Sequence, residues 1–278
     1  ARVEYELSVI KQKGYSPYFL VVADLLHYAR THGILSNIRG SVSGSMVTYL
    51  SGITNIDPIE FQIPFERFLN PARKSMPDID IDFADTRREE VIQYLRKKYG
   101  SDRVANIVTF QTIAAKQAFR DIGRVFSIPD RDIDLLAKMI TDNKMDLRTA
   151  YKSVPALRDL VDKEPFYLNI VKLATKIEGL IRQPGLHAAG IVLNDQPMVT
   201  SIPVSFDSGI CVTQYEMNFL EEQGFLKMDL LGLRTLSIID HCVSMINQAH
   251  KLSLKATEIP FTDPKIFTLI SSGRTMGL

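Results

Sequence analysis

The chain has 278 residues, of which 45% are hydrophobic and 23% charged, a balance that is ordinary for a soluble globular protein. Its formal net charge of +1 excludes a global excess of positive charge, so any surface for nucleic acid must be local. No apolar run reaches the length of a transmembrane helix and the first residues lack the apolar core of a signal peptide, so we expect a cytoplasmic protein with no membrane partner. Cys211 and Cys242 are isolated, which fits packing residues rather than a disulfide framework or a zinc site.

Short helices and strands alternate through the first part of the chain. In chain order, the patterns predict two helices over residues 5–31 that break at Gly14, a strand at Ile34-Leu35, a Gly/Ser-rich turn into the helix MVTYL, the strand SMPDIDIDF, a helix from a capping box at Thr86–Glu89 to about Gly100, and the strand VANIVTF. From about Thr112 to Ile181 the helical pattern is nearly continuous, with loops at residues 142–144 and 164–165. Strands return in GIVL, ICVT and FLKMDL before helices resume near Leu233. We therefore expect an α+β protein whose mixed sheet is interrupted by an inserted helical subdomain. The last residues, SSGRTMGL, lack a closing element, which suggests a piece of a longer chain.

Three aspartates alternate with apolar residues in SMPDIDIDF. A strand sends successive side chains to opposite faces, so Asp78, Asp80 and Asp82 share one face, each roughly 6.5 Å from the next. Like charges at this spacing repel, and carboxylate oxygens on a rigid face suit Mg²⁺, which binds one or two carboxylates together with substrate phosphates. A pair of such ions stabilises the attacking and leaving oxygens of a phosphoryl displacement. The alternative is a solvated strand face that is simply acidic.

The stretch from Arg39 to Ser45, Arg-Gly-Ser-Val-Ser-Gly-Ser, connects a predicted strand to a predicted helix. Small residues at a helix start let backbone N–H groups face an anion, and Arg39 adds a charged donor, so Arg39, Gly40, Ser41, Gly44 and Ser45 are candidate ligands of a triphosphate. The stretch is neither a Walker loop nor a dinucleotide-binding loop. Ser and Gly are also common helix-capping residues, so a purely structural role remains open.

Lys227 and Asp229 share one face of the predicted strand LKMDLL, opposite Leu226, Met228 and Leu230. A carboxylate in such apolar sequence needs a partner. Lys227 can be that partner; alternatively Asp229 completes the metal cluster from a neighbouring strand while Lys227 faces a phosphate.

Lys116, Arg120 and Arg124 recur every four residues and so share one helix face, where a phosphate backbone would relieve their mutual repulsion. Acidic neighbours such as Asp121 offer the competing explanation. Arg67 precedes the aspartates and is another candidate for a phosphate. His187 lies between small residues, for which a structural role is the simpler interpretation.

Five stretches together resemble the α subunits of bacterial DNA polymerase III, the DnaE-type replicative polymerases of family C. These are FERFLNPARKSMPDIDIDF, the Arg-Gly-Ser…Gly-Ser turn, TFQTIAAKQAFRDIGR, HAAGIVLND and LKMDLLGLRTLSII. The resemblance covers essentially the whole chain. It implies a palm of the DNA polymerase β-like nucleotidyltransferase type in residues 1–109 and 185–236, a helical thumb in residues 110–184 and the beginning of the fingers in residues 237–278.

The resemblance also implies the site residues. Asp78, Asp80 and Asp229 match the catalytic, metal-binding aspartates, while Asp82 matches an acidic position of less certain role. Gly40 and Ser41 match the phosphate-binding pair, with Arg39 beside them, and Arg67 and Lys227 match basic residues near the nucleotide. Two Mg²⁺ ions, for which Mn²⁺ can substitute, and a deoxynucleoside triphosphate are the implied cofactor and substrate. Primer–template DNA is the implied partner, as are a sliding clamp and other replisome subunits that bind segments absent here.

The chain departs from the family pattern at Ile38, which replaces a glycine, at Gln111, and at Met228 and Leu230 beside the third aspartate. We expect the parent protein to add deoxynucleotides to a primer on a template, and this fragment alone to be inactive. Two alternatives remain: a nucleotidyltransferase of the same fold that needs no template, and an inactive or accessory paralogue that binds primer–template DNA.

Overall fold

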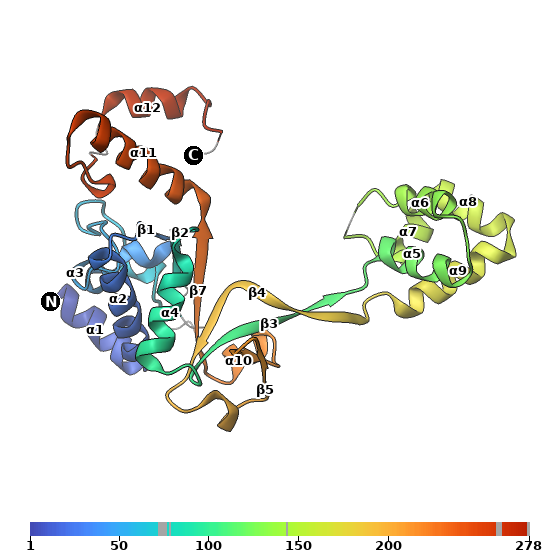
Figure 1. Cartoon of the computed structure of the whole chain (residues 1–278), viewed down its shortest axis with the longest axis horizontal. Helices are drawn as coiled ribbons and strands as arrows, with labels where there is room; N and C mark the ends of the chain where they lie inside the picture. Colours follow the sequence, from blue (N-terminus) through green and yellow to red (C-terminus); the bar gives the residue numbers. More distant parts are fainter. Residues whose placement is uncertain (72–76, 78, 143, 260–262, 277–278) are drawn as a thin grey trace. The chain divides into compact units, whose positions relative to one another are not determined.

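The computed structural model describes residues 1–71, 77, 79–142, 144–259 and 263–276. The chain forms two compact units, residues 1–107 with 187–278 and residues 108–186. Each unit is recognisable in Figure 1, the second by its green and yellow helices.

The described residues form one seven-stranded sheet in the order β1-β2-β7-β4-β3-β6-β5. The strands are β1 (Ser36–Arg39), β2 (Asp80–Ala84), β3 (Val104–Thr112), β4 (Ile181–Leu193), β5 (Val204–Asp207), β6 (Ile210–Thr213) and β7 (Leu226–Leu233). Strands β2 and β7 are parallel, and each pairs antiparallel with its other neighbour, β1 and β4 respectively. The predicted mixed sheet in an α+β protein is therefore confirmed.

Helices pack on the sheet of the first unit and continue beyond the C-terminal end of β7 (Figure 1). They are α1 (Arg2–Gln12), α2 (Ser16–Thr31), α3 (Met46–Leu50), α4 (Arg88–Tyr99), α10 (Met217–Glu222), α11 (Arg234–His250) and α12 (Pro264–Ser271), with short 3₁₀ turns η1 (Ser41–Gly44), η2 (Phe65–Arg67), η3 (Met198–Thr200) and η4 (Ala256–Glu258). Apolar residues of α1, α2 and α4 pack on one face of the sheet, against Ile81, Ile191 and Leu230. A smaller core that includes Val192 packs on the opposite face. Because both faces are covered, side chains in the central strands are held in fixed orientations.

The second unit contains α5 (Ala115–Val125), α6 (Asp130–Met139), α7 (Leu147–Ser153), α8 (Pro155–Lys163) and α9 (Pro165–Ile177), together with the adjoining ends of β3 and β4. These helices surround a core of their own. Gly123 lets α5 and α6 pack closely, because a Cβ atom at this position would lie 2.0 Å from the Ile133 Cδ1 atom of α6. Helical structure within the predicted range 112–181 is therefore confirmed.

Three local predictions need correction. The first strand begins at Ser36 rather than Ile34. The predicted loop at residues 164–165 is reduced to Glu164, the N-cap of α9, because Pro165 already begins that helix and proline is well tolerated in the first helical turn. The capping box at Thr86 is wrong, since α4 begins at Arg88 with Arg87 as its N-cap and no side-chain capping bond.

Within the described part of the chain, no helix is both long enough and apolar enough to cross a bilayer.

Candidate active site

The acidic strand β2 lies inside the sheet, between β1 and β7. Ile79, Ile81 and Phe83 are fully buried in the core, as the alternating pattern predicts. Asp80 stands on the opposite face and is partly exposed. Asp78, also predicted for this face, lies outside the described residues.

Asp229 reaches the same place from β7. Its Cα atom is the register partner of Asp80 in the parallel β2–β7 pair, so the two carboxylates stand side by side on one face of the sheet. Side chains on parallel neighbours are separated by about 4.8 Å between strands, which is close enough for two carboxylates to share a cation. The structure thus brings together two of the three predicted catalytic aspartates.

Lys227 is the ion-pair partner of Asp229. Its Nζ atom lies 2.8 Å from the Asp229 Oδ2 atom, and the two side chains are only 12% and 15% exposed. The second oxygen, Oδ1, is buried and has no hydrogen-bond partner among the described residues. A buried carboxylate oxygen without a partner costs free energy, so this atom is a natural ligand for a cation.

The donor set is therefore compatible with Mg²⁺, which prefers carboxylate oxygens. Among the described residues, however, no three acidic, histidine or cysteine side chains are already gathered in a metal-binding arrangement. Asp80 and Asp229 are the described residues that could hold such an ion.

Asp82 has a different environment from Asp80, although both belong to β2. Its side chain is completely buried and accepts two hydrogen bonds from Arg39, one from Nε at 2.5 Å and one from Nη2 at 2.9 Å. This pairing, with a smaller contribution from Asp80, raises the pKa of Arg39. The structure accordingly gives Asp82 a structural role and commits two nitrogens of Arg39, a predicted phosphate ligand, to an internal ion pair.

The Gly/Ser-rich turn divides into an exposed and a buried part. Gly40 and Ser41 are exposed directly after Arg39, whose Cα atom is the register partner of Asp80. Gly40 has a φ of 92°, a conformation that glycine adopts without strain. These two residues therefore lie near the aspartates with their backbone accessible.

Gly44 and Ser45 face the interior instead. A Cβ atom on Gly44 would lie 2.7 Å from the Pro64 carbonyl oxygen, and the Ser45 hydroxyl caps α3 by accepting from Thr48 N. The same hydroxyl donates to Glu6 Oε2 at 2.7 Å. The structural alternative considered for this turn thus applies to its second half.

Glu6 is a residue that the sequence reasoning missed. Its side chain is fully buried and also accepts from Val47 N at 3.0 Å and from Arg2 Nε at 2.9 Å. A glutamate on the apolar side of α1, three residues before Val9, is the signal that could have identified it. It ties α1 to the turn that carries Gly40 and Ser41.

Ile38, which replaces a family glycine, lies in β1 with its side chain packed against the first hydrophobic core. Alternation along the strand places this side chain opposite Arg39, so Ile38 does not project onto the face of Asp80. Arg67 is exposed at the end of η2, where the described residues offer its side chain no ion pair.

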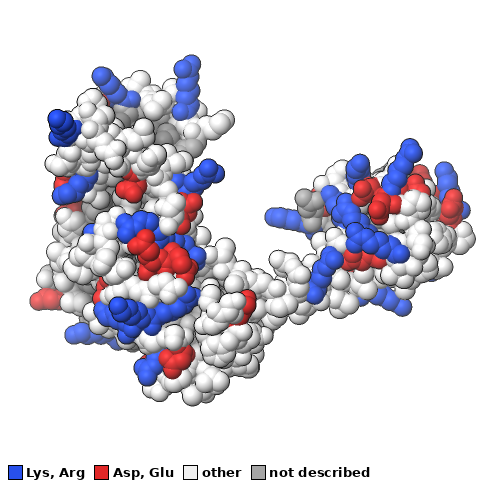
Figure 2. Space-filling view, viewed as in Figure 1, with Lys and Arg blue, Asp and Glu red and all other residues white. Residues whose placement is uncertain are grey.

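The predicted basic face of α5 is largely neutralised within the second unit. Arg120 pairs with Asp134 at 3.0 Å and Arg124 approaches Asp121 at 3.5 Å, while Lys116 has an interaction of its own. Basic and acidic side chains lie next to one another over this unit (Figure 2). The repulsion that suggested a DNA phosphate as partner is therefore already reduced, and DNA binding by these residues stays a prediction.

His187 has a structural role. Its Nδ1 atom accepts the backbone N–H of Gly190 at 2.6 Å and that of Ala189 at 3.3 Å, so the ring proton is on Nε2 in the neutral form. Gly190 is the register partner of Asp229, and a Cβ atom on it would lie 2.8 Å from His187 Nδ1. The histidine thus packs beside the strand pair that positions Asp229.

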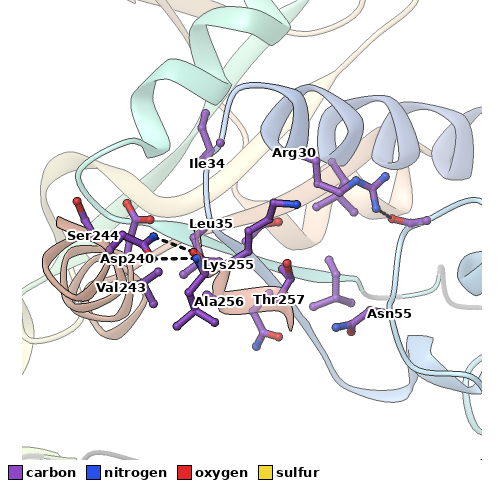
Figure 3. Close-up of a pocket in the computed structure, with 18 of the residues that line it drawn as sticks. Arg30, Ile34, Leu35, Asn55, Asp240, Val243, Ser244, Lys255, Ala256 and Thr257 are labelled. Carbon is purple, nitrogen blue, oxygen red and sulfur yellow. Dashed lines mark hydrogen bonds between the residues drawn. The ribbon is translucent and has the colours of Figure 1, made fainter. Parts of the chain in front are cut away.

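A cleft of about 970 Å³ lies elsewhere in the first unit. Figure 3 shows lining residues from α2, α11 and η4, among them Arg30, Asp240 and Ala256. Arg30 points to the turn below it and donates to the Gly52 carbonyl oxygen at 2.6 Å. Neither Asp80 nor Asp229 belongs to its lining, so this cleft does not contain the predicted chemistry.

The chain matches two families of known proteins. Residues 1–232 match the bacterial DNA polymerase III alpha NTPase domain, and residues 235–278 match the bacterial DNA polymerase III alpha subunit finger domain. The chain is 46% identical over 280 residues to DNA polymerase III subunit alpha of Bacillus subtilis (strain 168), and 44% identical over 282 residues to that of Thermus aquaticus. A third relative, from Aquifex aeolicus (strain VF5), is 40% identical over 303 residues.

Each of these alignments includes the whole of this chain but only 25%, 23% and 26% of the relative, in the same order. The chain thus spans about a quarter of the length of the curated relatives it matches. The first family match nevertheless covers residues 1–232, and so includes Asp80, Asp229 and the Gly40-Ser41 turn. The chain belongs to the bacterial DNA polymerase III α-subunit family.

Proposed function

We propose that the protein containing this chain is a DNA-directed DNA polymerase, which adds deoxynucleoside monophosphates to a primer 3′ end and releases pyrophosphate. The observation that carries this proposal is the pairing of Asp80 with Asp229 on adjacent strands, where one buried Asp229 oxygen lacks a partner among the described residues. The names of the relatives support DNA synthesis in general.

Asp78, Asp80 and Asp229 are the proposed ligands of two Mg²⁺ ions. When bound, these ions supply the positive charge that activates the 3′ hydroxyl and neutralises the triphosphate. The chain's own contribution is rigid placement: β2 and β7 fix Asp80 and Asp229 before substrate arrives. The exposed backbone of Gly40 and Ser41 is proposed to bind the triphosphate, assisted by Lys227 and by Arg67.

The two units suggest how the domains divide. We assign residues 1–109 and 185–236 to a palm of the DNA polymerase β-like type, residues 110–184 to a helical thumb and residues 237–278 to the start of the fingers. The thumb is proposed to contact primer–template DNA through Lys116, Arg120 and Arg124, provided that DNA competes with their present partners. Partners beyond DNA, a sliding clamp and other replisome subunits, would bind outside this chain, in the cytoplasm.

Primer extension tests the proposal. The natural polypeptide that contains this chain is incubated with primer–template DNA, Mg²⁺ and either four deoxynucleotides or one at a time. We expect extension that follows the template and is abolished by Asp80→Asn, while unfolding of the variant is nearly unchanged. Asp195→Asn, which alters an exposed aspartate of the same unit, is the matched control and should extend normally.

Each alternative has its own result. Extension that ignores the template would favour a template-independent nucleotidyltransferase. Salt-sensitive DNA binding without extension, and without metal-dependent nucleotide binding, would favour a DNA-binding paralogue.

A further inference from the structure

Lys227 contacts a carboxylate oxygen that a bound metal ion would also contact. Its ammonium lies 2.8 Å from Asp229 Oδ2, and both side chains are more than four-fifths buried. A cation coordinated by Asp229 would therefore meet an oxygen that Lys227 already neutralises.

Charge explains why a lysine lies beside these carboxylates. Asp80 and Asp229 are register partners on adjacent strands, and two carboxylates this close repel unless a cation lies near them. Arg39 is less suited to neutralise Asp80 and Asp229, because its Nε and Nη2 atoms already donate hydrogen bonds to the buried Asp82. Lys227 is thus the cation that contacts Asp229 directly.

The pairing satisfies only half of Asp229. Its Oδ1 atom is buried without a hydrogen-bond partner among the described residues. A single ammonium at Oδ2 compensates the charge but leaves this acceptor unmet, whereas a divalent ion can coordinate carboxylate oxygens directly. A divalent ion can therefore compete with Lys227 for the carboxylate of Asp229.

We infer that Lys227 is a resident counter-ion, which stabilises Asp229 in the metal-free chain and gives up Oδ2 when a divalent cation binds. Lysine suits this exchange because its compact charge sits on a flexible four-carbon stem, while arginine would hold the carboxylate through a rigid pair of hydrogen bonds. The released ammonium then becomes available to the triphosphate. This inference rests on the proposed function and adds a link between metal occupancy and phosphate binding.

The test is a Mn²⁺ titration without DNA or nucleotide, read by electron paramagnetic resonance, on the natural polypeptide and on two variants. Lys227→Met should bind Mn²⁺ at least about tenfold more tightly, because even in water a unit charge about 5 Å from a divalent ion changes affinity by that factor. Lys227→Arg should bind it more weakly than the wild type. Unchanged affinity in both variants, or the reverse order, overturns the inference.

Thermal unfolding supplies a second readout. In chelator, Lys227→Met should unfold at a lower temperature than the wild type, and Mn²⁺ should restore more of the loss than it adds to the wild type. A loss that is equal with and without Mn²⁺ would reduce Lys227 to a structural residue and contradict the inference. Should Lys227→Met fold only with Mn²⁺, that dependence supports the exchange, and Lys227→Arg still decides the order of affinities.

Lys98→Met is the matched control, since Lys98 also pairs with an aspartate, Asp24, in the same unit. Its loss of stability should not depend on Mn²⁺. Asp229→Asn separates the two levels of the argument. A wild type that binds no Mn²⁺, or binds it equally well after Asp229→Asn, defeats the proposed metal site itself, whereas normal wild-type binding with indifferent Lys227 variants defeats only the exchange.

Discussion

The ion pair between Arg39 and Asp82 should contribute measurably to the stability of the first unit. Replacing Arg39 with methionine keeps much of the side-chain length but removes the charge and both hydrogen bonds. The Asp82 carboxylate would then remain buried in the sheet without its cation. We therefore expect Arg39→Met to destabilise the first unit.

The magnitude follows from the exposure of the two partners. Breaking a fully buried ion pair costs about 3–5 kcal/mol, whereas an exposed pair contributes about 0–1 kcal/mol. Asp82 is 0% exposed and Arg39 is 49% exposed, so water screens only one side of the interaction. A loss of about 2 kcal/mol is expected for Arg39→Met. Arg39→Lys keeps the charge and loses the two-bond geometry, so we expect about half of that loss.

Urea unfolding measures this loss. The chain has no tryptophan, and eight of its ten tyrosines belong to the first unit, so tyrosine fluorescence reports mainly on that unit. Arg67→Met, at an exposed arginine, is the control and should change the unfolding free energy by less than about 0.5 kcal/mol. The double variant Arg39→Met/Asp82→Asn should lose less than the sum of the single variants. Equal stability of Arg39→Met and wild type would refute the reasoning.

Three further perturbations test other parts of the structure. Burial and a hydrogen bond to Asp24 raise the pKa of Tyr99 from 10.0 to about 12, so the folded form keeps a proton that the unfolded chain loses. The free energy of unfolding should therefore fall between about pH 10 and 12, and a fall no steeper in the wild type than in Tyr99→Phe would contradict this. Gly190→Ala crowds His187 beside the strand of Asp229, so it should cost about 1–3 kcal/mol in urea unfolding, and a neutral result would count against that close contact. Gly123→Ala should destabilise the second unit by a similar amount, which hydrogen exchange of α5 would measure. Adding Ile133→Val should recover part of the lost stability because it removes the clashing Cδ1 atom, and no recovery would argue against this packing.

Local patterns predicted the elements well where one physical cause dominates. The alternation of SMPDIDIDF correctly buried Ile79, Ile81 and Phe83. It treated Asp80 and Asp82 alike, however, whereas the structure buries Asp82 completely. That difference depends on Arg39 from β1, and an ion pair across antiparallel strands has no signature in either strand alone.

The strand pattern of LKMDLL gave the juxtaposition of Asp229 with the acidic strand only as an alternative to an ion pair with Lys227, and the family resemblance favoured it. Parallel strands that are distant in the chain carry no local signal of their neighbours, because their pairing is set by the fold around them. Composition was equally ambiguous in the Gly/Ser turn, where exposed Gly40 and buried Ser45 belong to similar residue classes. Tertiary contacts, such as that of Glu6 with Ser45, distinguish the capping half from the exposed half.

The central claim is that Asp80 and Asp229 hold a divalent cation together. Anomalous diffraction from crystals soaked in Mn²⁺ tests it most directly, because the map locates the ion without reference to activity. We predict a peak between the two carboxylates, within coordination distance of an oxygen from each, that disappears in Asp229→Asn. Strong Mn²⁺ peaks elsewhere, with none at this pair of strands, would contradict the claim.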